Sequence, residues 1–320
     1  MDFSIVITTH NRNIDLAECL NSIIKQTFVP SEIIIIDNSP VNEAKKAAIS
    51  FKAPAESVGA KLIYIGNSKE NSLTAARNLG IIKSSGEIVL FLDDDVVLDR
   101  NYLKQIAATY DSYPDAVGVQ GYYRIGKISS LGNWLKKIFF LYHYEKNYCR
   151  ILRSVSATYP YNLKQIIPCQ WLSGANHSWK REAVDIIYDE KLKKYSEGED
   201  LDFSYRLYKK YPGRLYITPF AKLEHKASVA GRAVGREPIF MNEVYGMYLF
   251  FKLFGYDKLG LMIFAWSRIG KIMFAFSEAV ADFSAARIGQ IILIMRACLF
   301  SMRHIGRIRE GDVDFFNRRL

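Results

Sequence analysis

Apolar and polar positions along the first part of the chain repeat with the periods of strands and helices. Four short runs rich in β-branched residues have the length of buried strands: 3–8, 32–37, 61–65 and 87–92. Between them, apolar residues recur at helical spacing from Ile14 to Ile24, and a second helix is predicted over 71–83. This alternation predicts an α/β fold with a mainly parallel central sheet and helices on both faces.

Polar residues follow three of these predicted strands at their carboxyl ends. The first strand runs into 8–12, the second into 37–39 and the fourth into the acidic triplet 93–95. In α/β sheets of this kind, ligands bind beyond the carboxyl ends of the strands. We therefore expect the three strand ends to meet at one crevice, where the chemistry takes place.

Beyond residue 126 the sequence predicts an insertion, then the end of the first domain, and then a helical C-terminal region. Residues 127–168 form a basic, aromatic stretch with no clear period, and strands are predicted again near 214–218 and 222–225. Beyond residue 236 the chain is helical, apolar and basic. We expect a first domain over 1–236, with 127–168 as an insertion, and a helical region over 237–320.

Composition narrows the classes of partner. The formal charge of +10 favours anionic partners, namely nucleotide phosphates, nucleic acid or acidic lipid headgroups. The 4 cysteines are scattered without a C-x-x-C pair, so neither a zinc site nor a disulfide framework is indicated. The start of the chain has no signal-peptide pattern, and charged residues interrupt the apolar C-terminal third. We therefore expect a cytoplasmic protein without a transmembrane helix.

The acidic triplet is the first candidate for chemistry. Asp93, Asp94 and Asp95 follow a buried strand, where adjacent carboxylates repel one another and need a compensating cation. Mg²⁺ or Mn²⁺ suits carboxylate ligands together with the phosphates of a substrate. The alternative is a solvated acidic turn that caps a helix starting near Asn101.

Four motifs in this order carry a family resemblance: 3–12, 32–38, 75–80 and 92–95. Together they closely resemble the inverting glycosyltransferases of family 2, which have the Rossmann-like GT-A fold, and the resemblance covers about residues 3–226. It implies a nucleoside diphosphate-sugar donor, a saccharide or lipid-linked saccharide acceptor and a DxD-bound divalent metal.

The resemblance also implies how the metal and the diphosphate are held. Asp95 and Asp93 would hold the metal, and Asp94 would lie nearer the ribose or the donor sugar. His225 matches a histidine that completes the metal coordination in some members, although a lone histidine at a strand end is often structural. Arg232, with Arg236 nearby, would clamp the diphosphate or else belong to a basic surface.

Further residues match the nucleotide site of the family. Asp37 would accept a hydrogen bond from the base, with a turn or cap role as the alternative for Asp37 and Asn11. The other positions surround the nucleotide in the first-strand loop and on the following helix: Thr8, Thr9, Arg12, Arg77 and Asn78. For Arg77 the alternative is a cation on the helix surface.

The acceptor side matches two further elements. The segment 196–203 resembles the family's ED element, in which Asp200, or secondarily Glu199, would take the proton of the acceptor hydroxyl. The alternative for these carboxylates is a cap at the helix N-terminus. Trp171 and Gly174 match a loop that closes around the donor sugar, although Trp171 also suits a core position.

The C-terminal region offers a membrane contact. One predicted helical face carries Trp266, Ile269, Ile272, Met273 and Phe276, and residues 259–320 contain 9 Lys or Arg against 5 Asp or Glu. This pattern suits peripheral contact with anionic lipid at the cytoplasmic face of the membrane. The alternative is a helical subdomain that packs on the catalytic core or on a second subunit of a homo-oligomer.

Other function classes lack support in the sequence. A nucleotidyltransferase that makes sugar nucleotides would need an early Gly-rich loop followed by Arg and Lys, which is missing. A non-catalytic saccharide-binding scaffold would not need both Asp95 and Asp200. No nucleic-acid-binding motif accompanies the basic charge, so no nucleic acid partner is expected.

Overall fold

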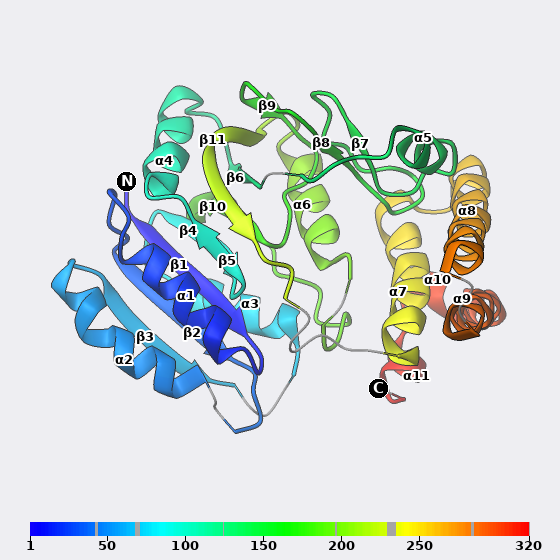
Figure 1. Ribbon diagram of the computed structural model, residues 1–320, viewed down its shortest axis with the longest axis horizontal. Coiled ribbons are helices and arrows are strands. Elements are labelled where there is room, and N and C mark those ends of the chain that lie inside the picture. The colour runs from blue at the N-terminus through cyan, green and yellow to red at the C-terminus, as the bar shows by residue number, and fades with distance from the viewer. Residues whose placement is uncertain are drawn as a thin grey trace. The chain divides into compact units, whose positions relative to one another are not determined.

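Four parallel strands form the first half of the central sheet (Figure 1). They are β1 (Phe3–Thr9), β2 (Glu32–Asp37), β3 (Lys61–Gly66) and β4 (Ile88–Asp93), in the order β3-β2-β1-β4. All four lie within one residue of the predicted bounds. β1 and β2 are buried along their whole length, as expected of central strands covered on both faces.

The structure is a computed structural model that describes residues 1–41, 44–67, 71–123, 125–195, 197–228, 235–282 and 285–319. Its contacts divide the chain into two units. The first comprises Met1–Ile125, Asn162–Tyr195 and Phe203–Arg232, and the second comprises Gly126–Tyr161, Ser196–Asp202 and Ala233–Leu320. Most of the segment expected as an insertion thus packs within the second unit, together with the C-terminal helices.

Helices cover both faces of the parallel strands, as predicted. One face carries Ile5, Ile7 and Ile33, which pack in the same core as α1 (Asn13–Ile23), α2 (Ala44–Ser57) and α4 (Tyr102–Ser112). The opposite face packs on α3 (Leu73–Lys83). A Cβ at Gly80 of α3 would lie 2.3 Å from Val6 of β1, so a glycine is required for this close approach.

Beyond β4 the sheet becomes mixed. β10 (Asn176–Lys180) runs antiparallel between β4 and β6 (Gly118–Tyr123), and β11 (Leu215–His225) runs parallel to β6. β5 (Val96–Leu98) and β9 (Ile167–Pro168) pair antiparallel with β11. The two strands predicted near 214–218 and 222–225 are one strand, β11, whose register with β6 shifts between Ile217 and Lys222.

The helical end of the chain agrees with the predicted C-terminal region. Its helices are α7 (Arg236–Phe254), α8 (Lys258–Asp282), α9 (Ala285–Arg303), α10 (Ile305–Arg309) and α11 (Asp314–Asn317). The second unit also contains α5 (Ser130–Ile138), β7 (His143–Glu145) and β8 (Thr158–Pro160). The remaining helices are the 3-10 turn η1 (Arg181–Ala183) and α6 (Glu199–Lys210).

One described helix has the length and composition of a membrane-crossing helix, whereas the sequence led us to expect none. The stretch Lys258–Val280 of α8 has 23 residues and a mean hydropathy of 1.4. Its four charged residues, Lys258, Arg268, Lys271 and Glu278, do not lower the mean hydropathy enough to exclude it. Core helices of soluble proteins meet the same two criteria, but only 22% of this stretch is buried.

Candidate active site

The carboxyl ends of β1, β2 and β4 lie side by side. Thr8 is in register with Asp93, and Thr9 is in register with Asp37. The hydroxyl of Thr9 donates to Asp94 Oδ2 at 2.7 Å, which joins the first-strand loop to the acidic triplet. The convergence predicted from the polar strand ends is therefore confirmed.

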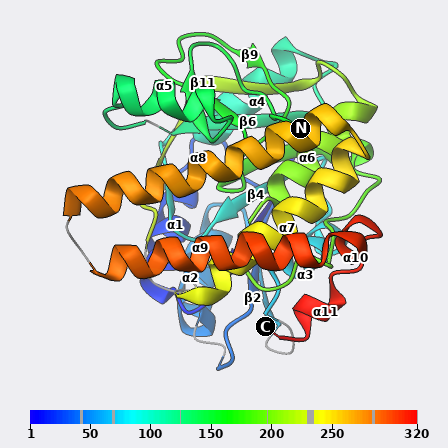
Figure 2. The ribbon, with the colours of Figure 1, turned by 90° about the vertical axis from the view of Figure 1, so that its right-hand side faces the viewer.

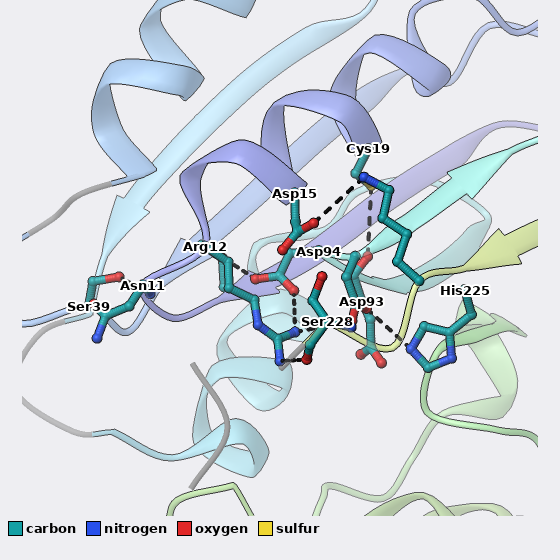
Figure 3. Close-up of polar contacts among 12 residues, drawn as sticks. Asn11, Arg12, Asp15, Cys19, Ser39, Asp93, Asp94, His225 and Ser228 are labelled. Carbon is teal, nitrogen blue, oxygen red and sulfur yellow. Dashed lines mark hydrogen bonds and ion pairs between the residues drawn. The ribbon is translucent and has the colours of Figure 1, made fainter. Parts of the chain in front are cut away.

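Asp93, Asp95 and His225 form a group that fits a divalent metal ion. Each offers one ligand atom, and these atoms lie within 4.8 Å of one another. Asp93 ends β4, Asp95 lies in the turn before β5, and His225 ends β11, which pairs with β5 (Figure 3). The tertiary structure thus brings together the three residues predicted as metal ligands.

The donor set of this group suits the expected ions. Among the described residues, Asp95 Oδ1 is buried without a hydrogen-bond partner, and His225 Nε2 lies 3.2 Å from it. Two carboxylates and one imidazole leave room for the oxygens of a phosphate or of water. The residues present therefore fit Mg²⁺ or Mn²⁺.

Arg12 neutralises the other side of the triplet. Its Nη1 lies 2.9 Å from Asp94 Oδ1 and 3.4 Å from Asp95 Oδ2, and its Nη2 donates to the carbonyl of Ser228 at 3.2 Å (Figure 3). Burial raises the pKa of Asp94 to about 7, although Arg12 and Thr9 act in the opposite direction. For Asp95 burial also acts upward, but His225 and Arg12 outweigh it and lower the pKa.

Arg77 is buried beside Asp93 rather than exposed on the helix surface. Its side chain is 2% exposed, and Nη2 lies 3.5 Å from Asp93 Oδ1 and 3.1 Å from the carbonyl of Gly174. Burial raises the pKa of Asp93, and Arg77 acts against this rise. Arg77 thus connects the acidic triplet to the loop that was predicted to close around the donor sugar.

Other predicted donor residues are engaged with the chain itself. Asp37 is fully buried and accepts hydrogen bonds from Ser39 N, Ala44 N and Tyr64 Oη. This is the turn and cap role that the sequence left open. A contact of Asp37 with a nucleotide base stays a prediction.

Asn78 and Trp171 also lie in the interior. The side-chain amide of Asn78 donates to the carbonyl of Tyr188, accepts from the backbone N–H of Tyr188 and donates to Glu190 Oε1 at 2.8 Å. These hydrogen bonds connect α3 to the loop that contains Tyr188 and Glu190. Trp171 is 5% exposed, which matches the core position offered as its alternative. Their contacts with a donor stay predictions, and Arg232 lies outside the described residues.

The predicted base belongs to the second unit, at the start of α6. Asp200 Oδ1 accepts from Leu201 N at 2.8 Å, and Glu199 is buried beside it in the first turn. Asp202 is fully buried and lies 2.8 Å from Lys252 Nζ of α7. Both carboxylates proposed for catalysis therefore occupy helix N-terminal positions, where the helix dipole stabilises negative charge.

Sequence reasoning missed one partner of Asp95 and one partner of Asp202. The backbone N of Ser228 donates to Asp95 Oδ2 at 2.9 Å, and Lys252 pairs with Asp202. Ser228 follows the predicted strand that ends at His225, so its position near the triplet had a signal in the sequence. Lys252 had none, because it lies 50 residues from Asp202 within an apolar helix.

Comparison with known proteins gives a family match. A sequence model described as Glycosyl transferase family 2 matches residues 4–166, which is about half of the chain. The chain belongs to this family. The family 2 match includes the acidic triplet, whereas His225 and the predicted base Asp200 lie beyond it.

Curated relatives are similar over limited parts. The chain is 36% identical over 107 residues to the uncharacterized glycosyltransferase YwdF of Bacillus subtilis, which covers 33% of this chain and 37% of that protein. A glucosyl-dolichyl phosphate glucuronosyltransferase of Haloferax volcanii is 21% identical over 71% of this chain and 69% of its own length. The chain thus spans little more than a third of YwdF.

Solved structures show the same fold. Residues 1–349 of Staphylococcus aureus TarS match with a TM-score of 0.55 at 15% identity, over 98% of this chain and 88% of that one. GalNAc-T7 with UDP, GalNAc and Mn²⁺ matches with a TM-score of 0.55 at 19% identity, over 78% of this chain and 50% of that one. The family 2 chain therefore has the GT-A fold of these enzymes.

Proposed function

We propose that this chain is a metal-dependent inverting glycosyltransferase that moves a sugar from a nucleoside diphosphate-sugar to an acceptor hydroxyl by single displacement. The observation that carries the proposal is the group of Asp93, Asp95 and His225 at the carboxyl ends of the sheet. Such a group in a family 2 chain suits a diphosphate donor better than a role in stability alone.

The donor side rests on charge. Asp93, Asp95 and His225 would hold Mg²⁺ or Mn²⁺, which, when bound, neutralises charge on the departing nucleoside diphosphate. Arg12 keeps Asp94 and Asp95 in place, and Arg77 does the same for Asp93. These two guanidinium groups orient the carboxylates before a donor arrives, so less reorganisation is needed on binding.

The acceptor side rests on Asp200. A single displacement needs one carboxylate to take the proton of the attacking hydroxyl, and Asp200, with Glu199 as the second candidate, has this role in the proposal. Lys252 holds Asp202 in the same first turn of α6, which fixes the orientation of the segment that carries the base. The segment 127–168 is proposed to line the acceptor side.

Two relatives support the proposed substrate class and location by analogy. TarS is a poly(ribitol-phosphate) β-N-acetylglucosaminyltransferase, and the Haloferax protein acts on a glucosyl-dolichyl phosphate. By analogy, we propose a saccharide or lipid-linked saccharide acceptor in the synthesis of a cell-surface polysaccharide or glycolipid. The enzyme would then work at the cytoplasmic face of the membrane.

The test separates the reaction classes by their products. The chain is incubated with a panel of sugar nucleotides, candidate saccharide acceptors and Mn²⁺. A glycosyltransferase releases nucleoside diphosphate, a nucleotidyltransferase releases pyrophosphate, and a scaffold releases neither. Release of pyrophosphate, or of neither product across the panel, contradicts the proposal.

Two variants test the assigned roles. Asp200→Asn should lower transfer by about 10²- to 10⁴-fold while nucleoside diphosphate binding in the presence of Mn²⁺ stays unchanged. Asp95→Ala should weaken this binding as well, because it removes a metal ligand. Exposed Asp111 of α4 supplies the control, Asp111→Ala, which should change neither property. Equal loss of binding in the first two variants, measured by isothermal titration, would contradict the assignment.

A further inference from the structure

The second unit has two helices that expose a stripe of large apolar residues. On α8, large apolar residues are exposed at Leu259, Met262, Trp266, Ile269, Met273, Phe276 and Val280. Their spacing of three and four residues places them on one side of the helix. On α9, the residues exposed in the same way are Ile288, Ile292, Met295, Leu299 and Met302.

The charged residues in the middle of α8 point the other way. Arg268 and Lys271 reach Glu243 of α7 at 3.2 Å and 2.6 Å, and Glu243 is 2% exposed. A helix at the surface of a soluble domain normally buries its apolar side and exposes its charges. The opposite arrangement on α8 indicates that its exposed side is covered by something apolar.

The apolar surface extends over neighbouring elements. α8 and α9 lie side by side, and α5 lies along the other side of α8 (Figure 2). Trp266 Nε1 donates to the carbonyl of Ile138 at 3.0 Å, and Phe139 stacks on Trp266 with ring centroids 4.9 Å apart. α5 adds exposed Leu131 and Trp134 to this surface.

Cations border the apolar surface. Lys136 of α5 places its Nζ 5.9 Å from the ring of Phe274 on α8, and Arg296 and Arg303 are exposed on α9 beside its apolar stripe. Tryptophan and basic residues around an apolar face are typical of a helix lying in the interface of an anionic bilayer. A second copy of this chain would bring the same positive charges to the contact and be repelled.

The width of the apolar face also favours a lipid bilayer over a second copy of the chain. A helix pair that forms a coiled coil shows a narrow apolar seam with charged residues on both flanks. On α8 the exposed stripe is flanked by half-buried Leu261, Ile263 and Ile272 rather than by charges. A broad uncharged arc suits lipid, which surrounds a helix, better than one partner helix.

We propose that α5, α8 and α9 form a docking surface for an anionic lipid bilayer, with α8 and α9 lying in the plane of the interface. The proposal defines the membrane contact of the proposed function by its residues, and it adds α5 from outside the C-terminal region. Lipid binding does not require catalysis, so the two proposals can fail separately.

The test is flotation of the full chain with vesicles. We use phosphatidylcholine alone and phosphatidylcholine with phosphatidylglycerol in a two-to-one ratio. The chain should float with the anionic vesicles at low salt and less well at high salt, because salt screens the bordering cations. The variant Ile269→Asp with Ile292→Asp should lower partitioning by about tenfold or more.

The matched control replaces two exposed isoleucines of the first unit with aspartate, in the double variant Ile82→Asp with Ile187→Asp. It should float like the unchanged chain, and circular dichroism should show that both variants are folded. Failure of the unchanged chain to float, or equal flotation of the two variants, overturns the proposal. So does a dimer in analytical ultracentrifugation that only the α8 and α9 variant dissociates, since a second copy would then cover the surface.

Discussion

Two buried groups of charged residues in this chain have opposite compositions. At the strand ends of the first unit, the three carboxylates of Asp93, Asp94 and Asp95 face the guanidinium groups of Arg12 and Arg77. In the second unit the single carboxylate of Glu243 faces two cations, Arg268 and Lys271. Both groups combine burial with ion pairs, but the carboxylates are in excess only in the first.

The pKa values differ accordingly. Burial acts upward on both carboxylates, and it prevails at Asp94, where the pKa rises to about 7. At Glu243 the two cations outweigh burial and lower the pKa. An excess of buried carboxylates is relieved by a bound cation, whereas a carboxylate with two cations of its own needs no ligand. The first group is therefore suited to binding and the second to holding helices together.

The largest expected effect is on stability at Glu243. Glu243→Ala leaves Arg268 and Lys271 in a partly buried place without their carboxylate, which should lower the free energy of unfolding by about 3–5 kcal/mol. Urea denaturation followed by circular dichroism measures this change. Glu56→Ala on the exposed side of α2 is the control and should stay within about 0.5 kcal/mol. If Glu243→Ala changed the free energy of unfolding as little as the control, the ion pairs of Glu243 with Arg268 and Lys271 would not contribute to stability.

The next effect concerns metal addition. Mn²⁺ at about 100 times its dissociation constant should raise the free energy of unfolding of the first unit by about 2.7 kcal/mol, because it binds only the folded cluster. Asp95→Ala should abolish this gain, and Glu56→Ala should retain it. Thermal denaturation with and without Mn²⁺ gives the shift. Equal stabilisation of the Asp95 variant would place the ion elsewhere.

A smaller effect is expected on the pH dependence without metal. The pKa of Asp94 in the folded chain, about 7, lies above that of an unfolded aspartate, so the folded state binds the proton more tightly. The stability from this group is complete below about pH 4 and is lost as pH rises through about pH 7. Asp94→Asn should flatten this slope in urea titrations at several pH values. A slope that the variant leaves unchanged would assign the titration to another group.

The smallest effect is at Cys298, whose Sγ lies 3.6 Å from Glu243 Oε2. Cys298→Ala removes a weak hydrogen bond from a carboxylate that keeps both cations, so the loss should be about 1 kcal/mol. Burial raises the pKa of this thiol to about 12, and Glu243 adds to the rise, so it should react slowly with alkylating agents at neutral pH. Rapid alkylation in the folded chain would show that this side of Glu243 opens to solvent.

Local patterns were sufficient for much of the fold. The strands from β1 to β4 and the helices α1 and α3 follow from runs of β-branched residues and from apolar spacing, and these reflect burial within a few residues of chain. The antiparallel insertion of β10 between β4 and β6 could not be predicted in this way, because strand order depends on contacts between distant segments. The same limit explains why β11 was read as two strands.

The sequence by itself determined the α/β class, the family motifs and the acidic triplet, because each is written in adjacent residues or in a short period. Only the tertiary structure decided that His225 joins Asp93 and Asp95, that Arg12 reaches Ser228 across 216 residues, and that the charges of α8 turn inward toward Glu243. The physical reason is that ion pairs and metal sites depend on distances of a few ångströms between side chains. Those distances are set by how sheets and helices pack, and one helix face looks the same in sequence whether it meets protein or lipid.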